Sequence, residues 1–175
     1  MGNAEDYIPI ARAAWTRGQA LAVWRITVGL VLLWVAAIVA VPAAREMGFG
    51  FGDGLNTFFS YICHQIPERS FYLGSYPFAV CSRCFGVYSG LLAGLLSYPL
   101  FRRIEDTDPL PRRWLFLSLV PIGIDWSLNI FGIWENTHFT RVVTGAILGS
   151  ACAVYIVPAL VEIRQNLALR RRSAG

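Results

Sequence analysis

Three cysteines and a histidine carry the residue types and the spacing in this sequence best suited to chemistry. Cys63 and His64 are adjacent, and Cys81 and Cys84 follow as a C-x-x-C pair. Thiolate and imidazole are ligands that soft transition metals prefer. The pattern therefore predicts a metal site that holds zinc or iron, either as a structural tie or as a catalytic centre.

The fourth ligand of such a site is less clearly specified than the three thiols. Adjacent side chains point apart in extended backbone, so Cys63 and His64 share one ion only in a tight turn. If His64 does not reach the ion, Asp125, His138 or water is left for the fourth position. A bound water would make the site open and suited to catalysis.

The C-x-x-C pair also fits redox chemistry. Cys81 and Cys84 fall on one face of a helix whose N-terminus favours their thiolates, and a thiolate attacks disulfides as readily as it binds metal. Thiol–disulfide exchange is therefore the alternative to metal binding, and a disulfide-stapled scaffold or partner subunit without chemistry is a third. These residues do not decide whether the protein is an enzyme. Cys152 stands alone in a later apolar run and is assigned no chemistry.

The composition indicates a membrane protein that must position these residues at one face of a bilayer. Hydrophobic residues make up 55% of the chain and charged residues only 15%, against about a quarter in soluble domains. We expect one all-α, polytopic domain over residues 1–175, because a span needs about 20 apolar residues. Four apolar runs are expected to cross the bilayer: residues 20–41, 84–101, 114–131 and 141–162. No basic tract alternates with aromatic residues, so lipid rather than nucleic acid is the expected partner.

The arginines predict the orientation. Ten lie in the two terminal segments and the loop between the second and third spans: Arg12, Arg17, Arg102, Arg103, Arg112, Arg113, Arg164, Arg170, Arg171 and Arg172. Positive residues concentrate on the cytoplasmic side, so both termini are expected there. The Cys/His loop, residues 42–83, is then extracytoplasmic, and the expected location is the cytoplasmic membrane of a bacterium.

Within that loop, apolar residues recur at helical spacing and predict a short helix. They are Phe51, Leu55, Phe58, Phe59 and Ile62. The helix could lie in the membrane interface with its aromatic face in lipid, or it could pack on the loop's own core. Both interpretations fit the pattern.

Small residues repeat every fourth position in two of the predicted spans. Gly86, Gly90 and Gly94 form one such stripe, and Gly145, Gly149 and Ala153 form another. Such stripes let helix backbones approach closely in lipid. We therefore expect the second and fourth spans to cross each other tightly.

Asp125 is a carboxylate inside a predicted span, where an ionisable group marks a partner or a function. Its expected ion-pair partner is Arg141. Three arginines, Arg69, Arg83 and Arg141, are candidates to bind an anionic lipid or small-molecule substrate. Asp125 or Glu135 could then move a proton.

Several of these residues together resemble a known group of proteins. The motifs are C-H-Q from Cys63, R-S-F from Arg69, and C-x-R-C-x-G-x-Y-x-G from Cys81, followed later by Asp125 and Asn136. They resemble a family of small predicted membrane proteins catalogued as a domain of unknown function. The resemblance implies a polytopic membrane protein with a Cys/His site and implies no activity.

A looser, architectural similarity links the chain to quinone-linked disulfide-forming enzymes and vitamin K epoxide reductases. In those proteins too, a C-x-x-C pair stands at the outer start of one of four spans. They need a second extracytoplasmic cysteine pair, whereas here only Cys63 is left over.

Overall fold

The computed structural model describes residues 17–106, 108 and 110–173, and its fold is helical. Within these residues five α-helices follow one another: α1 (Arg17–Glu46), α2 (Phe51–Ser60), α3 (Ser82–Phe101), α4 (Arg113–Ile130) and α5 (His138–Ser173). Between α2 and α3 lie a short 3₁₀ turn, η2 (Pro67–Arg69), and an antiparallel hairpin of strands β1 (Tyr72–Leu73) and β2 (Tyr76–Pro77). The predicted all-α class is confirmed, with this small hairpin as an addition.

Three helices, α1, α3 and α5, are long and apolar enough to cross a membrane. Large apolar side chains on their outer faces remain exposed, such as Leu33 at 68% and Leu100 at 82%. Exposed apolar surface of this extent is typical of a face that contacts lipid. The remaining predicted span, α4, is an 18-residue helix that includes Asp125 and is not one of these three. The arrangement with four spans therefore stays a prediction.

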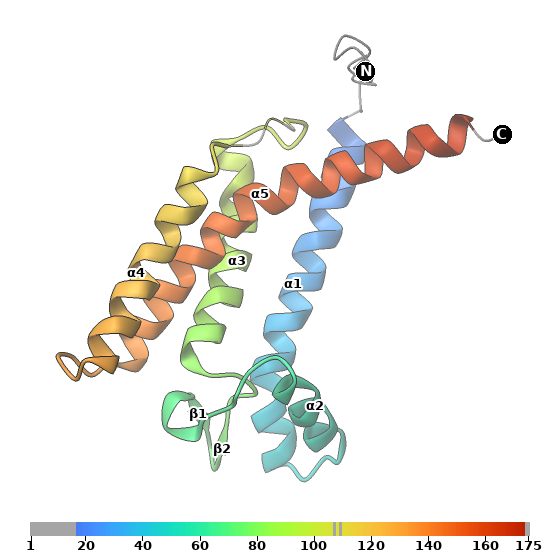
Figure 1. The fold of residues 1–175 in the computed structure, drawn as a ribbon. Coiled ribbons are helices and arrows are strands. Elements are labelled where there is room, and N and C mark those ends of the chain that lie inside the picture. The colour runs from blue at the N-terminus through green and yellow to red at the C-terminus, as the bar shows by residue number, and fades with distance from the viewer. Residues whose placement is uncertain (1–16, 107, 109, 174–175) are drawn as a thin grey trace, which may run out of the picture.

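The four long helices place the chain's connections at two opposite ends (Figure 1). The start of α1, the loop between α3 and α4, and the end of α5 lie at one end. Helix α2, the hairpin and the loop between α4 and α5 lie at the other. This grouping matches the predicted grouping of arginines, although Arg12 lies outside the described residues. Which end faces the cytoplasm stays a prediction.

The close packing of α3 against α5 explains the two stripes of small residues. A Cβ atom placed on Gly86 or Gly90 would come within 3.0 Å of the α5 backbone, and one placed on Gly145 or Gly149 within 3.0 Å of the α3 backbone. The hydroxyl of Ser150 also donates a hydrogen bond of 2.9 Å across this contact to the Gly90 carbonyl oxygen. The predicted tight crossing is confirmed, and it requires glycine because any side chain would separate the backbones.

Helix α2 is the short helix predicted in the Cys/His loop. Phe59 on this helix is 1% exposed and packs edge-on against Trp34 of α1, with ring centroids 5.2 Å apart. Phe51 and Phe58 remain 60% and 49% exposed. The helix therefore packs on a core mainly through Phe59, with the Phe58 ring also 5.9 Å from Trp34, and the exposed parts of Phe51 and Phe58 could still contact lipid as predicted.

Candidate metal centre

The thiols of Cys63, Cys81 and Cys84 meet at the start of α3. Their three sulfur atoms all lie within 4.8 Å of one another. The backbone N–H of Cys81 also donates to the Cys63 sulfur over 3.2 Å. All four cysteines of the chain are described, and each carries a free thiol. Because a zinc–sulfur bond is about 2.3 Å long, three sulfurs at this spacing can converge on one ion with small side-chain movements.

Apolar side chains from α1, α2 and the segment before α3 surround the three thiols. Cys63 is only 6% exposed, whereas Cys81 and Cys84 are half-buried. The buried neighbours are Ile38, Val41, Phe59, Ala79 and Val80. An apolar shell of this kind restricts water and strengthens the bond between a thiolate and a metal ion.

Helix α3 positions the C-x-x-C pair. Cys81 is the extended residue that precedes the helix, and Cys84 lies in its first turn, three residues further on. Hydrogen bonds from the thiols of Cys63 and then Cys84 lower the pKa of Cys81 far below that of an ordinary thiol, and backbone N–H groups of the first turn act in the same direction. Burial opposes this shift. Cys81 is thus favoured as a thiolate, the form that binds metals and attacks disulfides.

Gln65 brings Cys63 to the pair. Its backbone adopts a positive φ of 47°, which only a few per cent of non-glycine residues do. Its side-chain amide donates to the carbonyl oxygens of Asn56 and Ala79, each over 2.8 Å. One amide therefore ties α2 to the segment before Cys81. The sequence showed Gln65 only as a member of the C-H-Q motif, and its bridging role was not predicted.

The other residues considered as ligands lie outside the group of three sulfurs. His64 is exposed, in keeping with the argument that neighbours in sequence point apart, and Glu135 is exposed in the loop between α4 and α5. The ring of His138 lies against Phe71, with centroids 5.2 Å apart, and its Nδ1 atom is buried without a hydrogen-bond partner. Within the described residues the cluster therefore offers three protein ligands.

Asp125 forms an ion pair with Arg83, so the expected pairing with Arg141 is wrong. Asp125 is 8% exposed, and its Oδ2 atom accepts from the Arg83 guanidinium and, over 3.2 Å, from the Asn136 amide. Arg141 donates to Asn136 Oδ1 over 2.9 Å and so reaches Asp125 only through that amide. Arg83 precedes Gly86 on the α3 face that packs on α5, and this spacing was the available signal for its position.

The charges of three arginines interact with one another near the thiols. Arg141 lies within electrostatic range of Arg69, Arg83, Asp125 and Cys81. Arg69 belongs to η2, Arg83 to the first turn of α3 and Arg141 to the first turn of α5. The fold thus gathers the three predicted anion-binding arginines from separate elements, with Asp125 among them.

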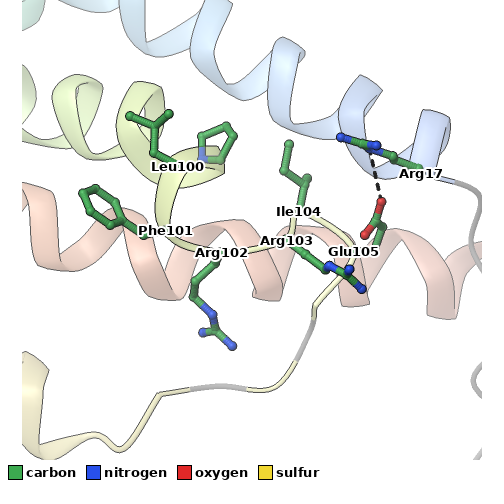
Figure 2. A pocket seen from close by; sticks show the side chains of 8 residues that line it. Arg17, Leu100, Phe101, Arg102, Arg103, Ile104 and Glu105 are labelled. Carbon is green, nitrogen blue, oxygen red and sulfur yellow. Dashed lines mark ion pairs between the residues drawn. The ribbon is translucent and has the colours of Figure 1, made fainter.

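A cavity of about 610 Å³ lies at the opposite end of α3 and is lined in part by Arg17, Arg102 and Arg103 (Figure 2). Two of these arginines have carboxylate partners: Arg17 pairs with Glu105 at 3.6 Å, and Arg102 with Asp106 at 2.8 Å. The Arg17–Glu105 pair links α1 to the loop after α3, and the Arg102–Asp106 pair lies within that loop. We therefore regard this end as a structural junction.

Comparison with known proteins identifies similar proteins in archaea. An uncharacterised protein of the archaeon Methanocaldococcus jannaschii is 38% identical over 106 residues, which cover 60% of this chain and 67% of that protein. An uncharacterised protein of Methanothermobacter thermautotrophicus is 35% identical over 96 residues, or 55% of this chain and 85% of that protein. Both relatives are archaeal, so a bacterial membrane stays a prediction. No solved structure matches the chain.

The family match covers the thiol cluster, the arginines and most of the α3–α5 contact. It runs over residues 63–155, more than half of the chain, and the family is described as Predicted membrane protein (DUF2085). The resemblance noted from the sequence motifs is thus supported at the level of the family. The chain belongs to the DUF2085 family of predicted membrane proteins.

Proposed function

We propose that this protein is an integral membrane protein that binds one zinc or iron ion through Cys63, Cys81 and Cys84. The observation that carries the proposal is the convergence of three free thiols within 4.8 Å. Three protein ligands leave a fourth position for water or a substrate atom, the arrangement of catalytic rather than structural zinc sites. His64 would then act outside the coordination shell.

The packing of α3 on α5 supports the arrangement with four spans, and the arginine distribution favours the extracytoplasmic face for the centre. Gly86 lies against Val142 and Gly90 against Ala146, so the two helices run parallel. If both cross the bilayer, the chain must return between them, and α4 is the segment that does so (Figure 1). Its 18 residues span about 27 Å, close to the bilayer's hydrocarbon thickness of about 30 Å.

Metal analysis of the protein purified in mild detergent, paired with thiol titration, tests the metal centre. We expect stoichiometric zinc or iron that is lost in Cys63→Ser, Cys81→Ser and Cys84→Ser. Cys152→Ser is the matched control, because Cys152 lies on α5 outside the cluster, and it should retain the metal. Metal-free protein in which two of the three clustered thiols are oxidised would contradict the proposal.

Thiol–disulfide exchange is the second candidate, favoured by the lowered pKa of Cys81. Here the Cys81 thiolate attacks a substrate disulfide and releases one substrate thiolate. Cys84 then displaces the second, which leaves a Cys81–Cys84 disulfide and a reduced substrate. Cys84→Ser would accumulate the mixed disulfide if this reaction occurs. A scaffold without chemistry would show neither metal nor mixed disulfide.

A further inference from the structure

We propose that Arg69, Arg83 and Arg141 form a binding site for a phosphate group beside the thiol cluster. The site would lie where the segment that follows η2 contacts the first turns of α3 and α5, through Phe71 against Phe85 and His138. The inference goes beyond the metal centre and does not depend on it, because it rests on the arginines and their partners.

The charges of this cluster do not balance. Asp125 is the carboxylate that acts on Arg141 together with the two other arginines. Three guanidinium charges less the Asp125 carboxylate and the Cys81 thiolate leave one positive charge in surplus. A divalent ion on three thiolates would also carry one negative charge, so a loaded metal centre leaves the same surplus. A phosphate group would supply the negative charge that the cluster lacks.

Hydrogen-bonding groups in the cluster also lack partners. Arg83 Nε and His138 Nδ1 are both buried without a hydrogen-bond partner. His138 is three residues before Arg141 on α5, so the two share a helix face. Buried donors without acceptors are costly and are rare in native proteins. An oxyanion that enters the cluster would supply the acceptor that Arg83 lacks.

The positions of the three arginines in different elements favour a phosphate ligand over a carboxylate ligand. They come from three separate elements, so their guanidinium groups are not set side by side along one helix. A carboxylate offers two oxygens in one plane, whereas a phosphate offers oxygens in all directions, each able to accept charge-assisted hydrogen bonds. The phosphate could belong to a lipid head group or to a soluble ion, and the experiment separates these sources.

Arginine footprinting on the wild-type protein tests the site without a risk to folding. Detergent-solubilised protein is treated with phenylglyoxal in the presence of inorganic phosphate, or of acetate at equal ionic strength, and modified arginines are counted by mass spectrometry. The same reaction is run in nanodiscs with and without phosphatidic acid. We expect protection of Arg69 and Arg141. The matched control is Arg45, which pairs with Asp53 at 2.8 Å and lies over the Tyr76 ring, and its modification should not change.

Protection by inorganic phosphate identifies a soluble ligand, and protection by phosphatidic acid alone identifies a lipid. Equal modification of Arg69 and Arg141 under all conditions overturns the proposal. A variant provides the second measurement: exposed Arg69→Gln should weaken binding of the protecting phosphate about tenfold, whereas Arg45→Gln leaves it unchanged. Metal content should be the same in both variants, so a failed phosphate site is distinguishable from a failed metal site.

Discussion

At the scale of single residues, Gln65 sets the distance between Cys63 and the C-x-x-C pair. Its amide is the donor to two backbone carbonyl oxygens on either side of the loop. In Gln65→Glu the donor becomes an acceptor facing two acceptors, which should release the loop. We expect faster metal loss to a chromogenic chelator, by about fivefold or more, since an unsatisfied polar group in a partly buried site costs about 1–3 kcal/mol.

Asn56→Ala is the matched control for that experiment. It keeps the backbone carbonyl that accepts from Gln65 and removes only the weaker side-chain contact of 3.3 Å. Metal release from this variant should resemble that of the wild type. Equal release from Gln65→Glu and the wild type would show that the amide does not position Cys63.

The buried carboxylate gives a second prediction at this scale. Asp125→Ala would leave Arg83 without its ion-pair partner, and removal of one member of a buried pair costs about 3–5 kcal/mol. Double-mutant cycles in detergent should therefore show strong coupling between Asp125 and Arg83. The coupling between Asp125 and Arg141 should be weaker, because Asn136 connects them. Equal coupling in both cycles would contradict the observed connectivity.

These residues show which contacts of the site could be predicted from the sequence and which could not. The spacing of Cys81 and Cys84 on one helical turn is a local property, so their proximity could be predicted. The partner of Asp125 depends on how α4 lies relative to α3 and α5, which no local pattern records. Arg141 was predicted as the partner of Asp125 because of its position at the outer start of the fourth span, whereas Arg83 forms the ion pair. Gln65 connects segments nine and fourteen residues away and gave no periodic signal.

At the scale of helices, the α3–α5 contact should not tolerate a side chain at its centre. Gly90→Leu and Gly149→Leu would each force the Cβ into the backbone of the opposite helix. Overpacking costs about 1–3 kcal/mol where side chains can move, and backbone cannot move as easily. We expect lower thermal stability of both variants in detergent. Gly29→Leu is the matched control, because a Cβ there meets nothing within 4 Å.

Helix starts were predictable to within three residues because each apolar run is continuous in sequence, whereas α1 extends five residues and α5 eleven residues beyond the predicted ends. The run predicted at 20–41 is helix α1, which extends further to Glu46. This extension has a role: the Glu46 carboxylate accepts from the backbone N–H of Ser75 over 3.0 Å and holds the hairpin against α1. The two-residue strands themselves were too short to give an alternating pattern.

At the scale of the whole molecule, the direction of α3 and α5 bears on the predicted number of spans. Because α3 and α5 run parallel, the loop before α4 and the loop after it lie at opposite ends of the helices (Figure 1). Arg112 and Glu135, one in each loop, are both exposed. If α4 crosses the bilayer, these residues lie on opposite sides of it, and positive residues favour the cytoplasm for Arg112.

Cysteine accessibility in intact cells tests directly whether positions 112 and 135 lie on opposite sides of the membrane. In a Cys152→Ser background, Glu135→Cys should react with a membrane-impermeant maleimide from outside, and Arg112→Cys only after permeabilisation. The three native cluster thiols are present in both variants, so each result is read as the increase over the parent protein. Labelling of both sites from the same side would mean that α4 does not cross. Since α3 and α5 are parallel, at least one of them would then fail to span, despite an apolar window typical of a membrane helix.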